Sequence, residues 1–288
     1  MRRSVLVFLI FPSLAFCGAR VDIGAGPRFP GTALTIRFYP SQESLSPSAS
    51  AFKQTADFYA ADTQTAVAMD YAIVAIPLQT KAGSYPLKVQ WTEAGLLQSA
   101  SFRIRVLRRP GKIVTVHLPE KATKAVGFLS QDKPLMEAAF LRSSGPPLWR
   151  GYFLKPVPAT RLSEAFGVER RYMPLGATWR HKGLDMPVPS GTPVKAANDA
   201  VVVLAREGLK AYGGLVVLSH GYGLCSSYMH LSKVMVREGE IVAKGAVIAL
   251  SGSEGIATGA HLHWQMNLRG FAIDPSPWMD KETLAALK

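Results

Sequence analysis

The chain is dominated by short stretches in which apolar and polar residues alternate. Clear examples are "LTIRF" (34–38), "YPLKVQW" (85–91) and "FRIRV" (102–106). Successive side chains of an extended strand point to opposite faces, so such alternation is typical of half-buried strands. The 25 glycines and 20 prolines among 288 residues supply the turns between them. The pattern therefore predicts an all-β protein, mostly antiparallel, with few long helices.

The first strand-rich region covers residues 20–110. Turn-forming segments such as "PSQESLSPS" and "TKAGS" separate its strands. Strands of this length and spacing are typical of a small β-sandwich, and we predict an immunoglobulin-like domain here. Because the region shows no grouping of catalytic residue types, its predicted role is spacing or binding.

Residues 111–155 have a different composition, and we interpret them as a linker with a short helix. The helix is predicted in "DKPLMEAAFLRSSG", with Asp132 as its cap, Pro134 in the first turn and Gly145 past the end. His117 also lies in this linker and is predicted to be a surface residue.

Short strands return over residues 156–279, the second predicted domain, and residues 280–288 are predicted to be a C-terminal tail. The strands include "AVVVLA", "GGLVVLSH", "CSSYMHL" and "HLHWQMNL", with glycine-rich turns between them. This domain contains five of the six histidines. We therefore expect any chemistry to reside here.

The N-terminus has the features of a signal peptide over residues 1–19. A basic "MRR" precedes an apolar stretch of about 13 residues and small residues that predict cleavage after Ala19. That stretch is short for a bilayer span, and no later segment is long and apolar enough, so we expect no transmembrane anchor. A lipid anchor on Cys17 stays open, although the bulky Phe16 argues against it. Loss of the signal leaves Cys225 alone, which excludes an internal disulfide.

The formal net charge is +13, and it becomes +11 once Arg2 and Arg3 leave with the signal. Outside the cytoplasm such a surface is attracted to anionic envelope polymers or lipid head groups. Nucleic acid is a poor partner for an exported chain. A solvated face that favours solubility explains the excess equally well.

Two histidines stand one residue apart in "GAHLHWQMNL", so in a strand His261 and His263 share one face. His181 and Asp185 are four residues apart in a stretch whose glycine and prolines disfavour a helix. Two imidazoles and a carboxylate suit Zn²⁺ with a fourth position open to water, as in catalytic zinc sites. Such an ion lowers the pKa of its water from about 15.7 towards 7 and polarises a carbonyl. Further histidines can then transfer protons.

The chain from about Leu154 to Trp278 resembles the lysostaphin/LytM-type zinc metallopeptidases, which cut peptidoglycan peptides. The motifs that carry the resemblance are "FGVER", "HKGLD", "GTPVKA", "SHGYG", "YMHLS", "VREGEIVAKGAVIALSG" and "TGAHLHW". The resemblance implies a groove on a mostly antiparallel sheet and peptidoglycan peptide stems as substrate. It also implies one zinc ion held by His181, Asp185 and His263, with His230 and His261 as the catalytic histidines.

Two further residues are predicted to support this site from outside the ligand set. The family usually has Phe-Glu after its His-x-His pair, where this chain has Trp264 and Gln265. Gln265 shares a strand face with His261 and His263, so we expect it to hold a histidine by a hydrogen bond in place of a carboxylate. His220, at a strand end before a glycine turn, is the other candidate.

Our leading hypothesis is an exported zinc metalloendopeptidase, of the periplasm or cell envelope or secreted, that cuts peptide cross-links. D-alanyl-diaminopimelate is the expected bond, and glycine bridges of other walls stay open. The alternative is a non-catalytic module that binds peptidoglycan or regulates a hydrolase. A mononuclear iron oxygenase also uses two histidines and a carboxylate, but its first histidine and carboxylate usually stand two residues apart. We also expect that the upstream domain or linker can inhibit the site by lying over the cleft.

Overall fold

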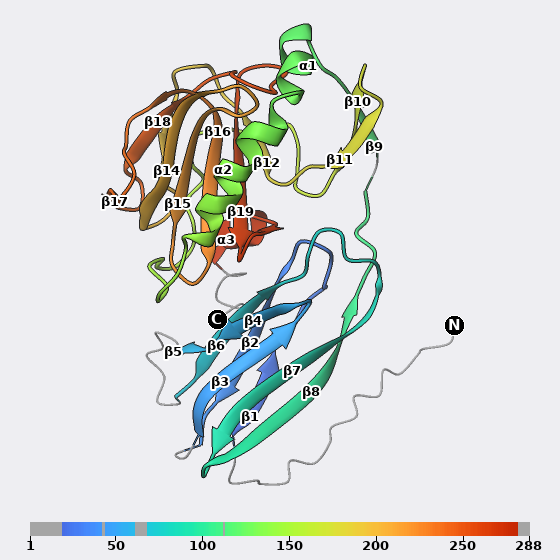
Figure 1. The fold of residues 1–288 in the computed structure, drawn as a ribbon, viewed down its shortest axis with the longest axis vertical. Coiled ribbons are helices and arrows are strands. Elements are labelled where there is room, and N and C mark those ends of the chain that lie inside the picture. Colours follow the sequence, from blue (N-terminus) through green and yellow to red (C-terminus); the bar gives the residue numbers. More distant parts are fainter. Residues whose placement is uncertain (1–18, 42–43, 61–67, 112, 282–288) are drawn as a thin grey trace, which may run out of the picture.

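The computed structural model describes residues 19–41, 44–60, 68–111 and 113–281. The predicted signal peptide up to residue 18, with Cys17, and the end of the predicted tail from residue 282 lie outside the described residues. In the described part of the chain, no helix has the length and apolar character needed to cross a bilayer. Figure 1 shows β-sheets in both parts of the molecule, and most strand pairs are antiparallel, which confirms the predicted fold class.

The N-terminal part consists of two four-stranded antiparallel sheets. The first has the order β1 (Arg20–Ile23), β2 (Ala33–Tyr39), β6 (Asp70–Ala75), β5 (Tyr59–Ala60). The second has the order β4 (Gln54–Asp57), β3 (Ser44–Ala51), β7 (Gly83–Glu93), β8 (Leu96–Val106). Apolar residues of both sheets, such as Ile36 and Val89, pack in one cluster because alternate side chains turn inward. The immunoglobulin-like character of this part stays a prediction.

The C-terminal part is built on a nine-stranded antiparallel sheet. Its main path has the order β12 (Leu184–Pro187), β19 (His261–Leu268), β16 (Leu224–Val234), β15 (Gly213–Ser219), β14 (Ala200–Leu209), β17 (Ile241–Val242). Off this path, β13 (Pro193–Lys195) pairs with β18 (Val247–Ser251), β18 also pairs with β16, and β20 (Phe271–Ile273) pairs with β19. A short helix, α3 (Ser276–Met279), follows the last strand.

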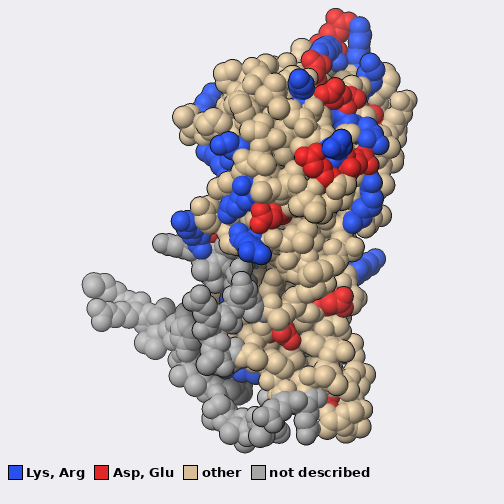
Figure 2. All heavy atoms as spheres, turned by 90° about the vertical axis from the view of Figure 1, so that its left-hand side faces the viewer, with Lys and Arg blue, Asp and Glu red and all other residues tan. Residues whose placement is uncertain are grey.

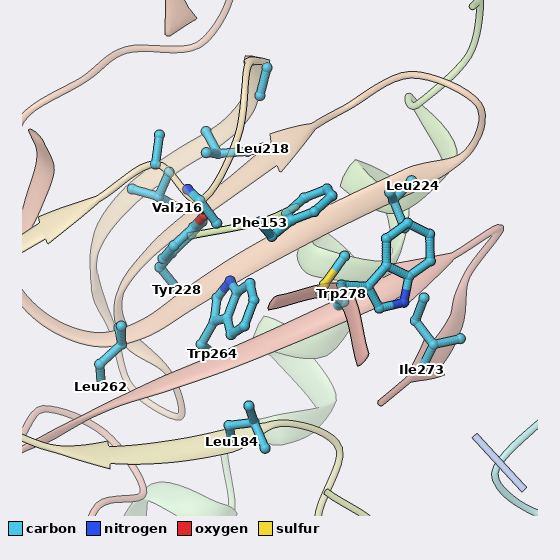
Figure 3. Close-up of a cluster of buried hydrophobic side chains, with 14 of the residues drawn as sticks. Phe153, Leu184, Val216, Leu218, Leu224, Tyr228, Leu262, Trp264, Ile273 and Trp278 are labelled. Atoms are coloured by element: carbon cyan, nitrogen blue, oxygen red, sulfur yellow. Dashed lines mark hydrogen bonds between the residues drawn. The ribbon is translucent and has the colours of Figure 1, made fainter. Parts of the chain in front are cut away.

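The strand β19 divides its side chains between two environments. Leu262, Trp264 and their alternate neighbours along the strand point into the main apolar cluster, where Trp264 lies among Leu184, Tyr228 and Trp278 (Figure 3). The intervening residues therefore face the other side of the sheet. The period-two pattern of this segment thus places both of its histidines on one face.

The predicted linker is more structured than expected. It contains β9 (Ile113–His117), α1 (Glu120–Val126) and α2 (Leu129–Leu141), and β9 pairs in parallel with β10 (Glu169–Met173), which pairs with β11 (Ala177–Arg180). The prediction of Asp132 as the helix cap was wrong, because α2 begins three residues earlier and has Phe128 at its N-cap. The Asp132 carboxylate instead accepts a hydrogen bond from the backbone N–H of Ala211 at 2.6 Å.

The two parts of the molecule share an apolar contact. Tyr71 and Ile73 of β6 belong to the same buried cluster as the core of the nine-stranded sheet. The Tyr222 hydroxyl accepts from the N–H of Ile73 at 2.9 Å and donates to the carbonyl of Asp57 at 2.8 Å. Buried apolar surface and satisfied backbone groups therefore hold the N-terminal sheets against the C-terminal part.

Charged side chains of both signs share the face of the molecule drawn in Figure 2. Lys and Arg lie there in several separate groups, with Asp and Glu among them. On this face the positive excess of the sequence does not form one continuous basic patch.

Candidate metal centre

Two neighbouring strands bring a carboxylate and an imidazole together. Asp185 of β12 lies directly opposite His263 of β19 in the antiparallel register, so their side chains share a face of the sheet. His181 precedes β12 and reaches the same face from the end of β11. Gly183, between His181 and Asp185, allows the chain to pass close to Trp264, because a Cβ there would lie 2.4 Å from the Trp264 carbonyl oxygen.

Three potential ligand atoms meet at this point. Nε2 of His181 lies 3.1 Å from Oδ1 of Asp185 and 3.0 Å from Nδ1 of His263, and the His263 and Asp185 atoms are 2.8 Å apart. Donor atoms around a tetrahedral zinc ion, with bonds of about 2.0–2.1 Å, are separated by about 3.3 Å. The spacing of the three atoms therefore fits a shared ion after small outward shifts.

The hydrogen bond of His181 to the main chain determines which of its nitrogens is available to a metal. Nδ1 lies 2.9 Å from the carbonyl oxygen of Ala165, which can only accept, so Nδ1 carries the proton. With the proton on Nδ1, the nitrogen left to bind a metal is Nε2, the atom that faces Asp185 and His263. Metal-binding histidines are commonly oriented by such a partner.

Burial and hydrogen bonding give the cluster the protonation states that a metal requires. Burial on its own would raise the pKa of Asp185, but the hydrogen bonds and charges of His181 and His263 hold it well below its usual range. Burial lowers the pKa of His263. An ionised carboxylate beside neutral imidazoles is the form in which these groups bind divalent ions.

His230 and His261 lie beside the cluster with one nitrogen each committed to the main chain. Nδ1 of His230 is 2.7 Å from the Glu254 carbonyl oxygen, and Nδ1 of His261 is 2.8 Å from that of Gly259. Their ring centroids are 4.8 Å apart, and Nε2 of His261 lies 3.7 Å from Oδ1 of Asp185. Burial lowers the pKa of His230 to about 3, so its ring is neutral near pH 7. Each histidine therefore has Nε2 available to accept a proton.

These histidines line a cleft of about 300 Å³. One side is formed by residues 256 and 258–261, which precede and begin β19, and another by Arg170 and Tyr172 of β10. Val116 and Leu118 of the predicted linker also line it. The upstream segment is therefore part of the wall of the candidate site.

Sequence reasoning missed Arg170, which contacts the carboxylate of the cluster. Its Nη2 atom lies 2.5 Å from Oδ2 of Asp185, and its Nε atom lies 2.6 Å from Oε2 of Glu164. Burial alone would lower the pKa of the guanidinium, but the charge and hydrogen bond of Asp185 raise it. Arg170 lies in the "FGVER" stretch, yet nothing in that stretch indicates a partner 15 residues away.

The two predicted supporting residues make their hydrogen bonds elsewhere. The ring nitrogens of His220 lie 2.8 Å from the Asp199 carbonyl oxygen and 2.8 Å from Oγ of Ser226. Gln265 donates from its amide nitrogen to Oδ1 of Asn267 at 2.6 Å. All three bonds involve groups outside the histidine cluster, and the supporting role of His220 and Gln265 stays a prediction. His117 is exposed at the end of β9, as a surface residue would be.

The β-sheet scaffold and the His-Asp-His cluster define a protein of the metallopeptidase class. Residues 179–275 match peptidase family M23, and this stretch includes His181, Asp185, His230, His261 and His263. Residues 179–275 therefore form an M23 peptidase domain within this chain.

Similarity to individual proteins agrees with this assignment. The chain is 33% identical over 164 residues to peptidoglycan DD-endopeptidase ShyA of Vibrio cholerae, covering 57% of this chain and 37% of the relative. It is 39% identical over 127 residues to DD-carboxypeptidase/endopeptidase Mpg of Neisseria meningitidis, covering 43% of this chain and 28% of the relative. The chain thus spans well under half the length of these relatives.

A solved structure extends the likeness to most of the chain. The crystal structure of a candidate M23 peptidase from Pseudomonas aeruginosa has a TM-score of 0.63 and 28% sequence identity. The match covers 88% of this chain and 95% of that chain. The fold described above, including the N-terminal sheets, therefore occurs in another protein with an M23 domain.

Proposed function

We propose that the protein is a zinc-dependent endopeptidase that hydrolyses peptide cross-links of peptidoglycan. The observation that carries the proposal is the meeting of Nε2 of His181, Oδ1 of Asp185 and Nδ1 of His263 within 3.1 Å of one another. Two further histidines stand beside these atoms with Nε2 uncommitted to the main chain. A metal site with neighbouring proton-transfer groups is an arrangement that can hydrolyse an amide.

The residues of the cluster have distinct roles in this proposal. His181, Asp185 and His263 would hold one zinc ion, which when bound lowers the pKa of a coordinated water towards 7 and polarises a carbonyl. Neutral His230 or His261 accepts a proton at Nε2, and the other histidine donates one to the oxyanion or to the leaving amine. The backbone oxygens of Glu254 and Gly259 keep both rings oriented for this transfer.

Peptidoglycan peptide stems are the proposed substrate, and D-alanyl-diaminopimelate is the proposed bond. The names of ShyA and Mpg, a DD-endopeptidase and a DD-carboxypeptidase/endopeptidase, support a D,D-bond. The N-terminal residues support an exported protein of the periplasm or envelope, where this substrate lies. The positive net charge, +13 for the whole chain and +11 without Arg2 and Arg3, is compatible with an anionic wall polymer.

Intramolecular restriction of the cleft is a further part of the proposal. Val116 and Leu118 line the cleft, and Lys121 of α1 pairs with Glu254 at 2.9 Å, next to the loop that precedes β19. Leu118→Ala should widen this wall and raise kcat/KM on wall peptides. Leu141→Ala, on the exposed side of α2, is the control. Equal rates in the two variants would argue against restriction by the linker.

The test of the proposed function measures zinc content and cleavage together. Purified sacculi are digested with the wild type, His263→Ala and the control His117→Ala, and released muropeptides are identified by mass spectrometry. We expect one zinc per chain and D,D-cleavage for wild type and control, and loss of both for His263→Ala. A wild type without metal, or undiminished cleavage by His263→Ala, would contradict the proposal. Tight sacculus binding by a wild type that cuts nothing would favour the non-catalytic alternative.

A further inference from the structure

We propose that Arg170 is a positioning residue that holds Asp185 so that one carboxylate oxygen faces the metal and the other is withheld from it. The inference rests on the metal site of the proposed function and concerns how this chain prepares one of its ligands. It assigns a role to a residue that lies outside the cluster of ligands and histidines.

The two oxygens of Asp185 have different partners. Oδ1 lies 3.1 Å from Nε2 of His181 and 2.8 Å from Nδ1 of His263. Oδ2 accepts a hydrogen bond from Nη2 of Arg170 at 2.5 Å. A carboxylate held in this way presents Oδ1 to the ion, since Oδ2 is already engaged by a cation.

Arg170 is itself fixed by several groups. Its Nε and Nη2 atoms both lie 2.6 Å from Oε2 of Glu164, and its Nη1 atom lies 3.3 Å from the Tyr172 hydroxyl oxygen. The side chains of Arg170, Glu164 and Asp185 are 13%, 15% and 9% exposed, so these charges are largely withdrawn from water. Without the guanidinium, the partly buried carboxylate of Glu164 and the buried one of Asp185 would repel each other. Arg170 therefore fixes the rotation of the Asp185 side chain as well as balancing its charge.

The backbone that carries these groups is also braced. Arg170 is the second residue of β10 and is paired with Val114 of β9 on one side and Trp179 of β11 on the other. The N–H of Asp185 donates to the Glu164 carbonyl at 3.1 Å, and the N–H of Ser163 donates to the Asp185 carbonyl at 3.0 Å. Main-chain bonds thus join Asp185 to the segment that precedes β10, and Arg170 stands on a strand paired on both sides, which is the support that precise ligand placement needs.

One-oxygen ligation has a consequence for the metal. A carboxylate that binds through both oxygens occupies an additional coordination position, whereas one oxygen leaves that position for solvent or substrate. Replacing Arg170 by Met frees Oδ2, and we expect Asp185 then to bind through both oxygens. The coordination number of the ion would rise even if the fold does not change.

Cobalt substitution of the full chain tests this inference. Four-coordinate Co²⁺ absorbs visible light more strongly than five- or six-coordinate Co²⁺, so the band intensity reports the number of ligands. We expect intense bands for wild type and for Arg171→Met, which changes the exposed neighbour of Arg170 on the same strand. Arg170→Met should show weaker bands, and its zinc Kd, measured by chelator competition, should rise by about tenfold. For Arg170→Lys, the band intensity and the zinc Kd should lie between those of the wild type and Arg170→Met, because lysine keeps the charge but lacks the forked donors.

This experiment distinguishes failure of the Arg170 inference from failure of the proposed peptidase function. Should Arg170→Met fail to fold, as judged by circular dichroism, Arg170→Gln and Arg170→Lys provide the comparison. A folded Arg170 variant with wild-type cobalt band intensity overturns the inference whatever its zinc affinity. A wild type that binds zinc but cuts no peptidoglycan contradicts the proposed function. The cobalt spectra of the Arg170 variants would still test the role of Arg170. Absence of metal binding by the wild type would overturn both.

Discussion

Gly183 lies against Trp264 so closely that no side chain fits between them. An added Cβ would lie 2.4 Å from the Trp264 carbonyl oxygen and 2.7 Å from Nε2 of His263. Gly183→Ala must therefore push β12 and β19 apart or displace the imidazole. We expect a loss of about 1–3 kcal/mol in the free energy of unfolding and weaker zinc binding, measured by urea denaturation and metal titration. Gly111→Ala, where the Cβ meets nothing within 4 Å, is the matched control. Equal effects in the two variants would contradict the steric account.

His220 predicts a pH dependence of stability that is separate from the metal site. Burial lowers its pKa to about 4 from 6.5. Between these pH values the unfolded chain binds a proton that the folded chain does not, so stability rises with pH. The contribution is complete above pH 6.5 and is lost as pH falls towards 4, by at most about 3 kcal/mol.

The measurement is the urea unfolding free energy of the metal-free protein from pH 4 to pH 7.5, compared with that of His220→Gln. Glutamine cannot take up the proton, so the variant should lose less stability on acidification over this window. A comparison between two otherwise identical chains cancels the titration of the other histidines. Parallel pH profiles for the two proteins would show that His220 does not titrate as its burial implies.

The hydrogen bond between Asp132 and Ala211 should help to hold α2 against the sheet, so its loss should lower the free energy of unfolding. The Asp132 carboxylate accepts from the N–H of Ala211 at 2.6 Å, and the Asp132 side chain is buried. Asp132→Ala leaves that N–H without its acceptor, which we expect to cost about 1–3 kcal/mol in unfolding free energy. Asp132→Asn retains an oxygen and should lose less, whereas the exposed Gln131→Ala should change little. Thermal and urea unfolding of the three variants check this order.

The features that the sequence predicted correctly depend on local periodicity. The alternation in "HLHWQMNL" is sufficient to place His261 and His263 on one face, because the period of a strand is two wherever it lies in the fold. The stretch "IVTVH" of β9 offered another local signal, since Ile113, Val114 and Thr115 are β-branched residues that favour strands. Our interpretation of residues 111–155 as a linker with a short helix does not use this signal.

The features that the sequence did not predict depend on partners distant in the chain. Asp132 and Ala211 are 79 residues apart, so the helix boundary could not be inferred from the capping pattern alone. Arg170 and Asp185 are joined only once β10 has paired with its neighbours. The steric role of Gly183 is likewise visible only when β19 lies beside it. Contacts between residues so far apart produce no periodic pattern in the local sequence.

The contact between the two parts of the molecule yields the last prediction, through the Tyr222 hydroxyl. This group accepts from the N–H of Ile73 at 2.9 Å and donates to the Asp57 carbonyl at 2.8 Å. Tyr222→Phe keeps the ring but leaves the buried N–H of Ile73 unsatisfied, so the unfolding free energy should fall by about 1–3 kcal/mol. Tyr85→Phe, which removes an exposed bond to the Lys81 carbonyl, should change it by no more than about 0.5 kcal/mol. Urea denaturation compares the two variants, and equal stability losses would mean that the hydroxyl of Tyr222 does not secure the N-terminal sheets to the C-terminal part.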